Sequence, residues 1–119
     1  MGKVAIKRVY DPPARGDGQR VLVDRVWPRG ISKEELKDAL WLKEVAPTTA
    51  LRQWFGHKPE RWRQFQTRYR KELEGNPEPL AQLRGLIRKG PVTLLYAAKD
   101  TEHNQAVVLA DYLTKQVKS

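Results

Sequence analysis

Hydrophobic residues along the chain follow two different spacings, and each spacing predicts a different kind of element. Short, nearly continuous apolar runs predict strands over residues 3–9, 20–24 and 91–98. The run over 91–98 is flanked by helix- and strand-breaking residues and should form the central, buried strand. Residues 39–45 fit either a helix end or a further strand, and a strand is favoured because Pro47 closes the segment.

Apolar positions spaced three and four residues apart predict helices in the remaining segments. Ser32 and Glu35 have the spacing of a capping box, and Thr48 and Asn76 are suited to cap later helices. The predicted helices cover residues 32–40, 48–55, 59–74 and 77–89, followed by a last helix that Asp100 or Thr101 would cap.

Strand segments that alternate with helical segments predict an α/β fold. We expect residues 1–119 to form a single small three-layer domain, with a mainly parallel sheet of about four strands flanked by helices, since 119 residues leave no room for a second core. The connection over residues 11–19 is short for a crossover between parallel strands. The residues alone therefore also allow an antiparallel first pair.

The composition narrows the class of function. Lys and Arg total 23 against 14 Asp and Glu, a formal charge of +9, so phosphates and nucleic acids are the first partners to consider; a basic surface without a specific partner is the alternative. The chain has no cysteine, which excludes disulfides, cysteine-ligated zinc and a cysteine nucleophile. Because no long apolar run or apolar leader is present, we expect a cytoplasmic protein without a membrane partner.

Candidate site residues follow the strands, because ligands of parallel α/β sheets bind beyond the carboxyl ends of the strands. Asp24 ends the second strand and suits a general base or a metal ligand, and Arg25 suits an anion, although an internal ion pair between them is the alternative. Trp27 and Arg29 flank Pro28 and offer a flat ring beside a planar cation for a base or a phosphate. The structural alternative is a tryptophan packed under the loop and an arginine bound to a backbone carbonyl.

The end of the last predicted strand and the start of the helix after it supply further candidates. Tyr96, Asp100 and Asn104 are placed to contact an anionic ligand near the helix amino terminus, and His103 is suited to act as an acid. Asp100 would instead be a helix cap if it bound the free backbone N–H groups. Arg15 lies in the Gly- and Pro-rich loop after the first strand, which fits a mobile lid or a plain flexible connection.

Metal and nucleic-acid sites are indicated more weakly. Asp11, Asp24 and Asp100 all follow predicted strands and could hold Mg²⁺ together with substrate oxygens; no other cofactor is indicated. His57, at a corner between helices, fits a structural hydrogen bond, and the two histidines lack the spacing of a zinc motif. Basic residues share a face of the helix over 59–74, which is typical of a solvated surface unless it continues into other basic residues as a phosphate track.

Several sequence motifs rich in uncommon residues are similar to those of one protein family, and together they extend over nearly the whole chain. They are Trp27-Pro28-Arg29-Gly30-Ile31 after Asp24-Arg25, Leu40-Trp41-Leu42-Lys43-Glu44-Val45, Trp54-Phe55-Gly56-His57, and Leu94-Leu95-Tyr96 before Glu102-His103-Asn104. The chain thereby resembles the YeaO-like branch of the Domain of Unknown Function 488 family. The resemblance implies that the first two strands are parallel, with the loop over 11–19 in place of a crossover helix.

The wider family implies one chemistry that this chain cannot perform. Relatives commonly carry a cysteine where Tyr96 stands, and a Cys-His-Arg string where residues 104–106 read Asn-Gln-Ala. Because this chain has no cysteine, any cysteine-based reaction of those relatives cannot operate in it.

Together these features predict a strand-end pocket for a nucleotide, a nucleic-acid end or a phosphorylated metabolite. In an enzymatic version, a hydrolase or transferase, Asp24 would act as base and His103 as acid, while Arg25 and Arg29 hold the anion. The alternatives are a nucleic-acid binding module without catalysis and an interaction domain whose charge has no specific ligand. The oligomeric state is left open.

Overall fold

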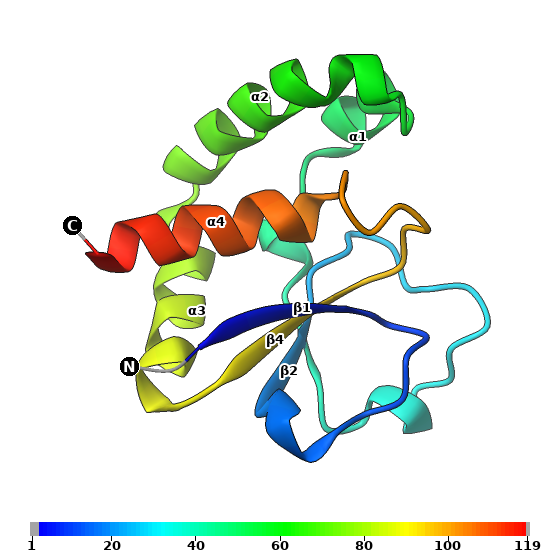
Figure 1. The fold of residues 1–119 in the computed structure, drawn as a ribbon, viewed down its shortest axis with the longest axis vertical. Helices are drawn as coiled ribbons and strands as arrows, with labels where there is room; N and C mark the ends of the chain where they lie inside the picture. The colour runs from blue at the N-terminus through cyan, green and yellow to red at the C-terminus, as the bar shows by residue number, and fades with distance from the viewer. Residues whose placement is uncertain (1–2, 119) are drawn as a thin grey trace.

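The sheet consists of four strands, each parallel to its neighbours, in the order β1-β4-β2-β3. The computed structural model describes residues 3–118, with side chains described as far as residue 115 (Figure 1). The strands are β1 (Val4–Arg8), β2 (Gln19–Leu22), β3 (Leu40–Trp41) and β4 (Val92–Tyr96). The predicted α/β domain with a parallel sheet is confirmed, and the antiparallel alternative for the first two strands is wrong.

β4 lies inside the sheet, as expected for a strand with mostly apolar side chains towards both faces. All five of its residues are buried, and it pairs with β1 on one side and with β2 on the other. Since β4 separates β1 from β2, the connection between those two strands crosses the sheet, and it does so without an α-helix. The parallel arrangement that the family resemblance implied is therefore confirmed.

The α-helices pack on one face of the sheet (Figure 1). They are α1 (Thr49–Phe55), α2 (Trp62–Glu74), α3 (Pro77–Lys89) and α4 (Gln105–Lys118). Thr48 caps α1 as expected, since its hydroxyl accepts a hydrogen bond from the amide of Leu51 at 3.2 Å. α4 begins later than expected, because the side chain of Asn104, and not that of Asp100, accepts from the amide of Val107 at 3.1 Å. None of the helices in the described part of the chain is long and apolar enough to cross a lipid bilayer.

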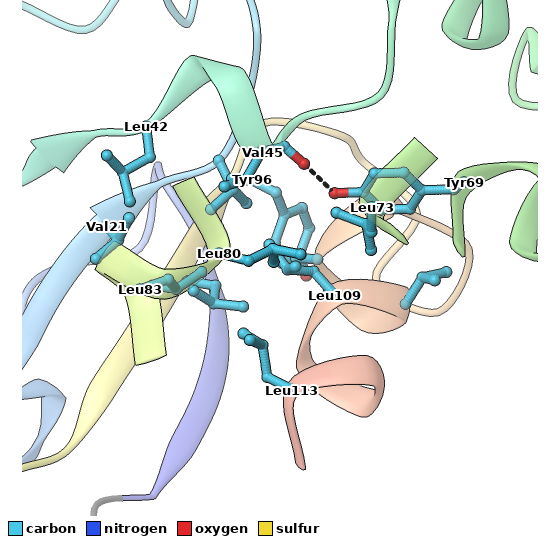
Figure 2. Packing of buried hydrophobic residues seen from close by; sticks show 14 of the residues in the cluster. Val21, Leu42, Val45, Tyr69, Leu73, Leu80, Leu83, Tyr96, Leu109 and Leu113 are labelled. Carbon is cyan, nitrogen blue, oxygen red and sulfur yellow. Dashed lines mark hydrogen bonds between the residues drawn. The ribbon is translucent and has the colours of Figure 1, made fainter. Parts of the chain in front are cut away.

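The main core lies between these helices and the sheet. Side chains from β2, α2, α3 and α4 meet there, among them Val21, Leu73, Leu83, Leu109 and Leu113 (Figure 2). Each fully buried leucine contributes about 1.5–3 kcal/mol. The helix layer is therefore held firmly against the sheet, which leaves the carboxyl ends of the strands as a fixed frame for a site.

Residues 39–45, for which the sequence favours a strand over a helix end, are part strand and part helical turn. Only Leu40 and Trp41 pair with β2, and the chain then makes one 3-10 turn, Lys43–Val45. This turn buries Val45, whose carbonyl accepts a hydrogen bond from the hydroxyl of Tyr69 on α2 (Figure 2). The strand is short because Val45 has to enter the main core.

Loops and single helical turns cover the opposite face of the sheet. Val9, Leu22, Leu36 and Leu95 form a small second core there. The helix predicted over residues 32–40 is reduced to one 3-10 turn, Glu34–Leu36. Ser32 and Glu35 do form the predicted capping box, with hydrogen bonds of 3.0 and 3.1 Å. The turn ends once Leu36 is buried, because the chain must then reach the edge of β2.

The loop after β1 runs back to the amino ends of the strands, so of the two alternatives left open by the sequence it is a connection and not a lid over the carboxyl ends. The Asp17 carboxylate accepts a hydrogen bond from Lys7 Nζ at 2.8 Å. The main-chain carbonyl of Asp17 accepts one from the hydroxyl of Thr93, also at 2.8 Å. The hydrogen bond from Lys7 holds the pKa of Asp17 below its usual range. The first residue of β2 then donates to the carbonyl of Pro91, just before β4. Arg15 is exposed on this side of the sheet, away from the carboxyl ends.

Candidate functional site

A cleft of about 550 Å³ opens at the carboxyl ends of the strands. Its walls come from the segments that follow β1, β2 and β4, from α1 and from the start of α4 (Figure 1). This is the edge at which parallel α/β sheets bind their ligands. The sequence candidates that line it are Asp24, Arg25, Trp27, Arg29, His103 and Asn104.

Asp24 is half-buried in the wall of the cleft between β2 and β4. Its Oδ2 accepts a hydrogen bond from the amide of Ala97 at 2.9 Å, and its Oδ1 accepts one from the side-chain amide of Gln105. Burial raises the pKa of Asp24 from 3.8 to about 6, although both hydrogen bonds and the charge of Arg52 act in the opposite direction. A carboxyl group of this kind can gain or lose a proton close to neutral pH, as a general base must.

Arg25 does not pair with Asp24, so the internal ion pair that the sequence allowed is not formed. Its Nε donates to the carbonyl of Pro47 and a terminal nitrogen to that of Ala46, both at 3.0 Å. These bonds hold the segment between β3 and α1, which forms one wall of the cleft. Two of the five guanidinium donors of Arg25 are therefore used on the main chain. Its role in ligand binding stays a prediction.

Trp27 and Arg29 differ in how many contacts their side chains make within the protein. Trp27 donates from Nε1 to the carbonyl of Ile31 at 2.7 Å and packs edge-on against Trp41 at 5.2 Å, while part of it borders the cleft. Arg29 is exposed, and its carbonyl accepts a hydrogen bond from the hydroxyl of Tyr10 at 2.8 Å. Among the described residues its guanidinium has no hydrogen-bond or ion-pair partner. Trp27 thus has the internal contacts of the structural alternative and also borders the cleft, whereas the guanidinium of Arg29 has no such internal contacts within the part of the chain that the structure describes.

Asp100 and His103 form a pair in the turn before α4. Asp100 Oδ1 accepts from the amides of Glu102 at 2.9 Å and His103 at 3.0 Å, and Oδ2 lies 2.9 Å from His103 Nδ1. The hydrogen bonds, that from Glu102 foremost, hold the pKa of Asp100 below its usual range. Asp100 does not line the cleft; it caps the turn and orients the His103 ring, which borders the cleft beside Trp62 at 5.1 Å.

Three other candidates are used by the fold or lie elsewhere. Tyr96 is 2% exposed and faces the main core, where burial raises its pKa (Figure 2). Asn104 borders the cleft, but its side chain caps α4 and donates to the carbonyl of Asp100 at 2.9 Å. Contrary to expectation, neither Tyr96 nor Arg15 is brought to the cleft. In an uninterrupted apolar run, the face to which a strand's last residue points cannot be read from the pattern.

Among the side chains that complete the cleft, sequence reasoning missed Arg52 on α1, His57 after it, and Gln105 at the start of α4. The side chains of Arg52 and His57 are exposed, and among the described residues neither has a hydrogen-bond or ion-pair partner. The expected structural hydrogen bond of His57 is therefore not formed, and its ring lies 6.1 Å from that of Phe55. His57 has a φ of 56°, in the left-handed region that few residues other than glycine adopt.

The predicted carboxylate cluster is not formed. In the part of the chain that the structure describes, no three His, Asp or Glu side chains are grouped to hold a metal ion, so Asp11, Asp24 and Asp100 do not come together. Asp24 is the one acidic residue among those that line the cleft. Mg²⁺ would have to bind through a single carboxylate and ligand oxygens, which stays a prediction.

The basic face of α2 does not continue into a track of free cations. Arg61 and Arg68 lie over the ring of Trp54 at 5.1 and 4.2 Å, and Arg70 pairs with a carboxylate of α4 at 2.8 Å. Arg20, which would have to extend the track across the sheet, is 5% exposed. These contacts engage part of the basic face within the fold, and the choice between a solvated surface and a phosphate track stays a prediction.

Comparison with known proteins confirms the resemblance seen in the sequence. The uncharacterized protein YeaO of Escherichia coli (strain K12) is 44% identical over 110 residues, which cover 92% of this chain and 96% of that protein. The uncharacterized protein Rv3073c of Mycobacterium tuberculosis (strain ATCC 25618 / H37Rv) is 43% identical over 111 residues, 93% of each chain. No solved structure matches the chain. The family model DUF488-N3i matches residues 3–119, and the chain therefore belongs to this family, which is described as the inactive DUF488-N3 subclade.

Proposed function

We propose that the chain binds a small anionic ligand of nucleotide size in the strand-end cleft. The charge of the cleft carries this proposal: Arg29 and Arg52 line it without a hydrogen-bond or ion-pair partner among the described residues, and Asp24 is the one acidic side chain of the lining. Planar guanidinium groups that are free to make two parallel hydrogen bonds suit phosphate oxygens. The formal charge of +9 also raises the local concentration of anions around the whole molecule.

The size and the walls of the cleft support a ligand with a planar part. A volume of about 550 Å³ lies within the range of roughly 300–1,000 Å³ that is usual for small-molecule sites. The rings of Tyr10, Trp27 and Phe55 line the same space, and Tyr10 is 43% exposed. Flat apolar surface beside free cations suits a nucleobase joined to a phosphate.

Binding without turnover is the version that we favour. Asp24 and His103 both line the cleft, so an acid and a base are available there. The chain lacks the cysteine of its wider relatives, however, and its family is described as inactive. We place this binding function in the cytoplasm, where nucleotides and phosphorylated metabolites occur. Phosphorus NMR of a nucleotide incubated with the protein tests for turnover, and no new resonance is expected.

Isothermal titration calorimetry tests the proposal with inorganic phosphate and with mononucleotides. Arg29→Ala and Arg52→Ala should each weaken nucleotide binding at least about tenfold, since a hydrogen-bonded charge is lost. Arg29→Lys should be nearly as damaging as Arg29→Ala, because an ammonium group cannot present two parallel donors. Arg15→Ala, an exposed cation outside the cleft, is the matched control and should bind like the wild type. Equal binding by all these proteins would contradict the proposal.

Salt dependence distinguishes this site from a nucleic-acid binding module. A single-stranded oligonucleotide held by about six phosphate contacts should lose about a thousandfold in affinity between roughly 50 and 200 mM salt. The affinity for a mononucleotide held by two arginines should fall far less over the same range of salt concentration. Steep salt dependence with an oligonucleotide, and no binding of mononucleotides, would favour the alternative.

A further inference from the structure

The Asp24 carboxylate has acceptor capacity that the protein leaves open. An ionised carboxylate offers about four acceptor sites. Asp24 uses one site on each oxygen, for the amide of Ala97 and for the side chain of Gln105. The remaining capacity belongs to a half-buried group that lines the cleft.

No cation of the described chain lies within ion-pair distance of this carboxylate. Arg25, its neighbour in sequence, directs its guanidinium to the carbonyls of Ala46 and Pro47. Arg52 acts on Asp24 only through its longer-range charge. A partly buried carboxylate without a cation is unfavourable, and donors on a ligand would relieve this cost.

The side chains of the cleft therefore suit a ligand that carries two different kinds of polar group. Arg29 and Arg52 require an anionic group, whereas Asp24 requires hydrogen-bond donors. The rings of Tyr10 and Trp27 border the same space and suit a planar group. A phosphate joined to a flat heterocycle with a donor edge would meet all of these demands.

We infer that the ligand is a guanine nucleotide, whose ring N–H and 2-amino group donate to the two Asp24 oxygens while Arg29 and Arg52 hold its phosphate. Of the common bases, guanine is the one that presents two adjacent donors on its pairing edge. The corresponding edges of adenine and cytosine place one amino donor beside an acceptor, and uracil places its single N–H between two acceptors. Those acceptors would face the carboxylate and be repelled. This inference rests on the proposed function of the cleft.

Calorimetry with guanosine and inosine 5′-monophosphates tests the inference, because inosine lacks only the 2-amino group. On the wild-type protein the guanosine compound should bind about tenfold or more tightly, as expected for one hydrogen bond to a charged group. Asp24→Asn should reduce this ratio to about one, because an amide presents one acceptor where the carboxylate presents two. Asp11→Asn, a carboxylate outside the cleft lining, should leave the ratio unchanged.

The outcomes separate this inference from the proposed function. Equal affinity of the two nucleotides for the wild-type protein would overturn the guanine assignment and leave anion binding in place. Failure of inorganic phosphate and of every mononucleotide to bind would overturn both. The ratio on the wild-type protein decides the assignment even if Asp24→Asn does not fold. Tight binding of guanosine monophosphate that Asp24→Asn does not weaken would also contradict the role of Asp24.

Discussion

Asp24 should make the free energy of unfolding depend on pH, and Asp24→Asn should remove that dependence. Burial raises the pKa of Asp24 from 3.8 to about 6 in the folded protein. Each pKa unit corresponds to about 1.36 kcal/mol, so the ionised carboxylate costs the folded state about 3 kcal/mol. Because the folded pKa lies above the unfolded one, the stabilisation is full below pH 3.8 and is lost as the pH rises through about 6.

The difference between the two proteins isolates this effect. Asparagine has nearly the same size and keeps an oxygen that can accept from the amide of Ala97. Any hydrogen bond that the substitution loses lowers stability equally at every pH. The other titratable side chains that line the cleft are present in both proteins, so their contributions to the pH dependence largely cancel. The stability of Asp24→Asn relative to wild type should therefore rise by about 3 kcal/mol between pH 3.5 and 7.5.

Urea unfolding at several pH values, followed by circular dichroism, measures this difference. Asp11→Asn, which replaces a carboxylate by an amide at an exposed position after β1, is the matched control for the substitution itself. A difference between Asp24→Asn and wild type that stayed constant from pH 3.5 to 7.5 would refute the reasoning. It would mean that Asp24 is as well solvated in the folded protein as in the unfolded chain.

Three further predictions concern the scaffold, and urea melts at neutral pH measure each of them. Gly18→Ala should destabilise the protein by more than about 2 kcal/mol, because Gly18 has a φ of 63° and a Cβ there would lie 2.2 Å from a backbone oxygen. Gly16→Ala should change the stability little, because its Cβ would meet nothing within 4 Å. Equal effects of the two substitutions would contradict this close approach. Tyr69→Phe should cost about 1–2 kcal/mol, since a buried backbone carbonyl loses its hydroxyl donor, and wild-type stability would show that the carbonyl finds another partner. Asn104→Ala should cost about 1 kcal/mol and speed hydrogen exchange in the first turn of α4, and unchanged exchange there would argue against its role as the cap.

The elements with strong local patterns could be predicted from the sequence. The apolar run at 91–98 identified β4, and Thr48 identified the start of α1, because each signal lies within a few neighbouring residues. The start of α4 could not be predicted in the same way. Asp100 and Asn104 are both suitable caps, and the path of the chain out of β4 decides between them.

The site was predictable only where the strand-end rule applied. Asp24 and Arg29 lie in the segment that follows β2, and His103 lies in the segment that follows β4, so the parallel sheet brings them to one cleft. Arg52 and His57 reach the same cleft because α1 packs at that edge, a tertiary arrangement that no local pattern reveals. The binding or reaction of a ligand at Asp24, Arg29 and His103 stays a prediction.

Amide chemical shifts during a titration with guanosine 5′-monophosphate test most directly where the ligand binds. If the ligand binds in the strand-end cleft, the amide resonances over residues 24–29, 97–98 and 103–105 should shift in a saturable manner. Amides over residues 15–18 and 90–92, at the amino ends of the strands, should stay in place. Saturable shifts confined to the amino-end residues or to α2, with the cleft amides unchanged, would contradict the assignment of the ligand site to this cleft.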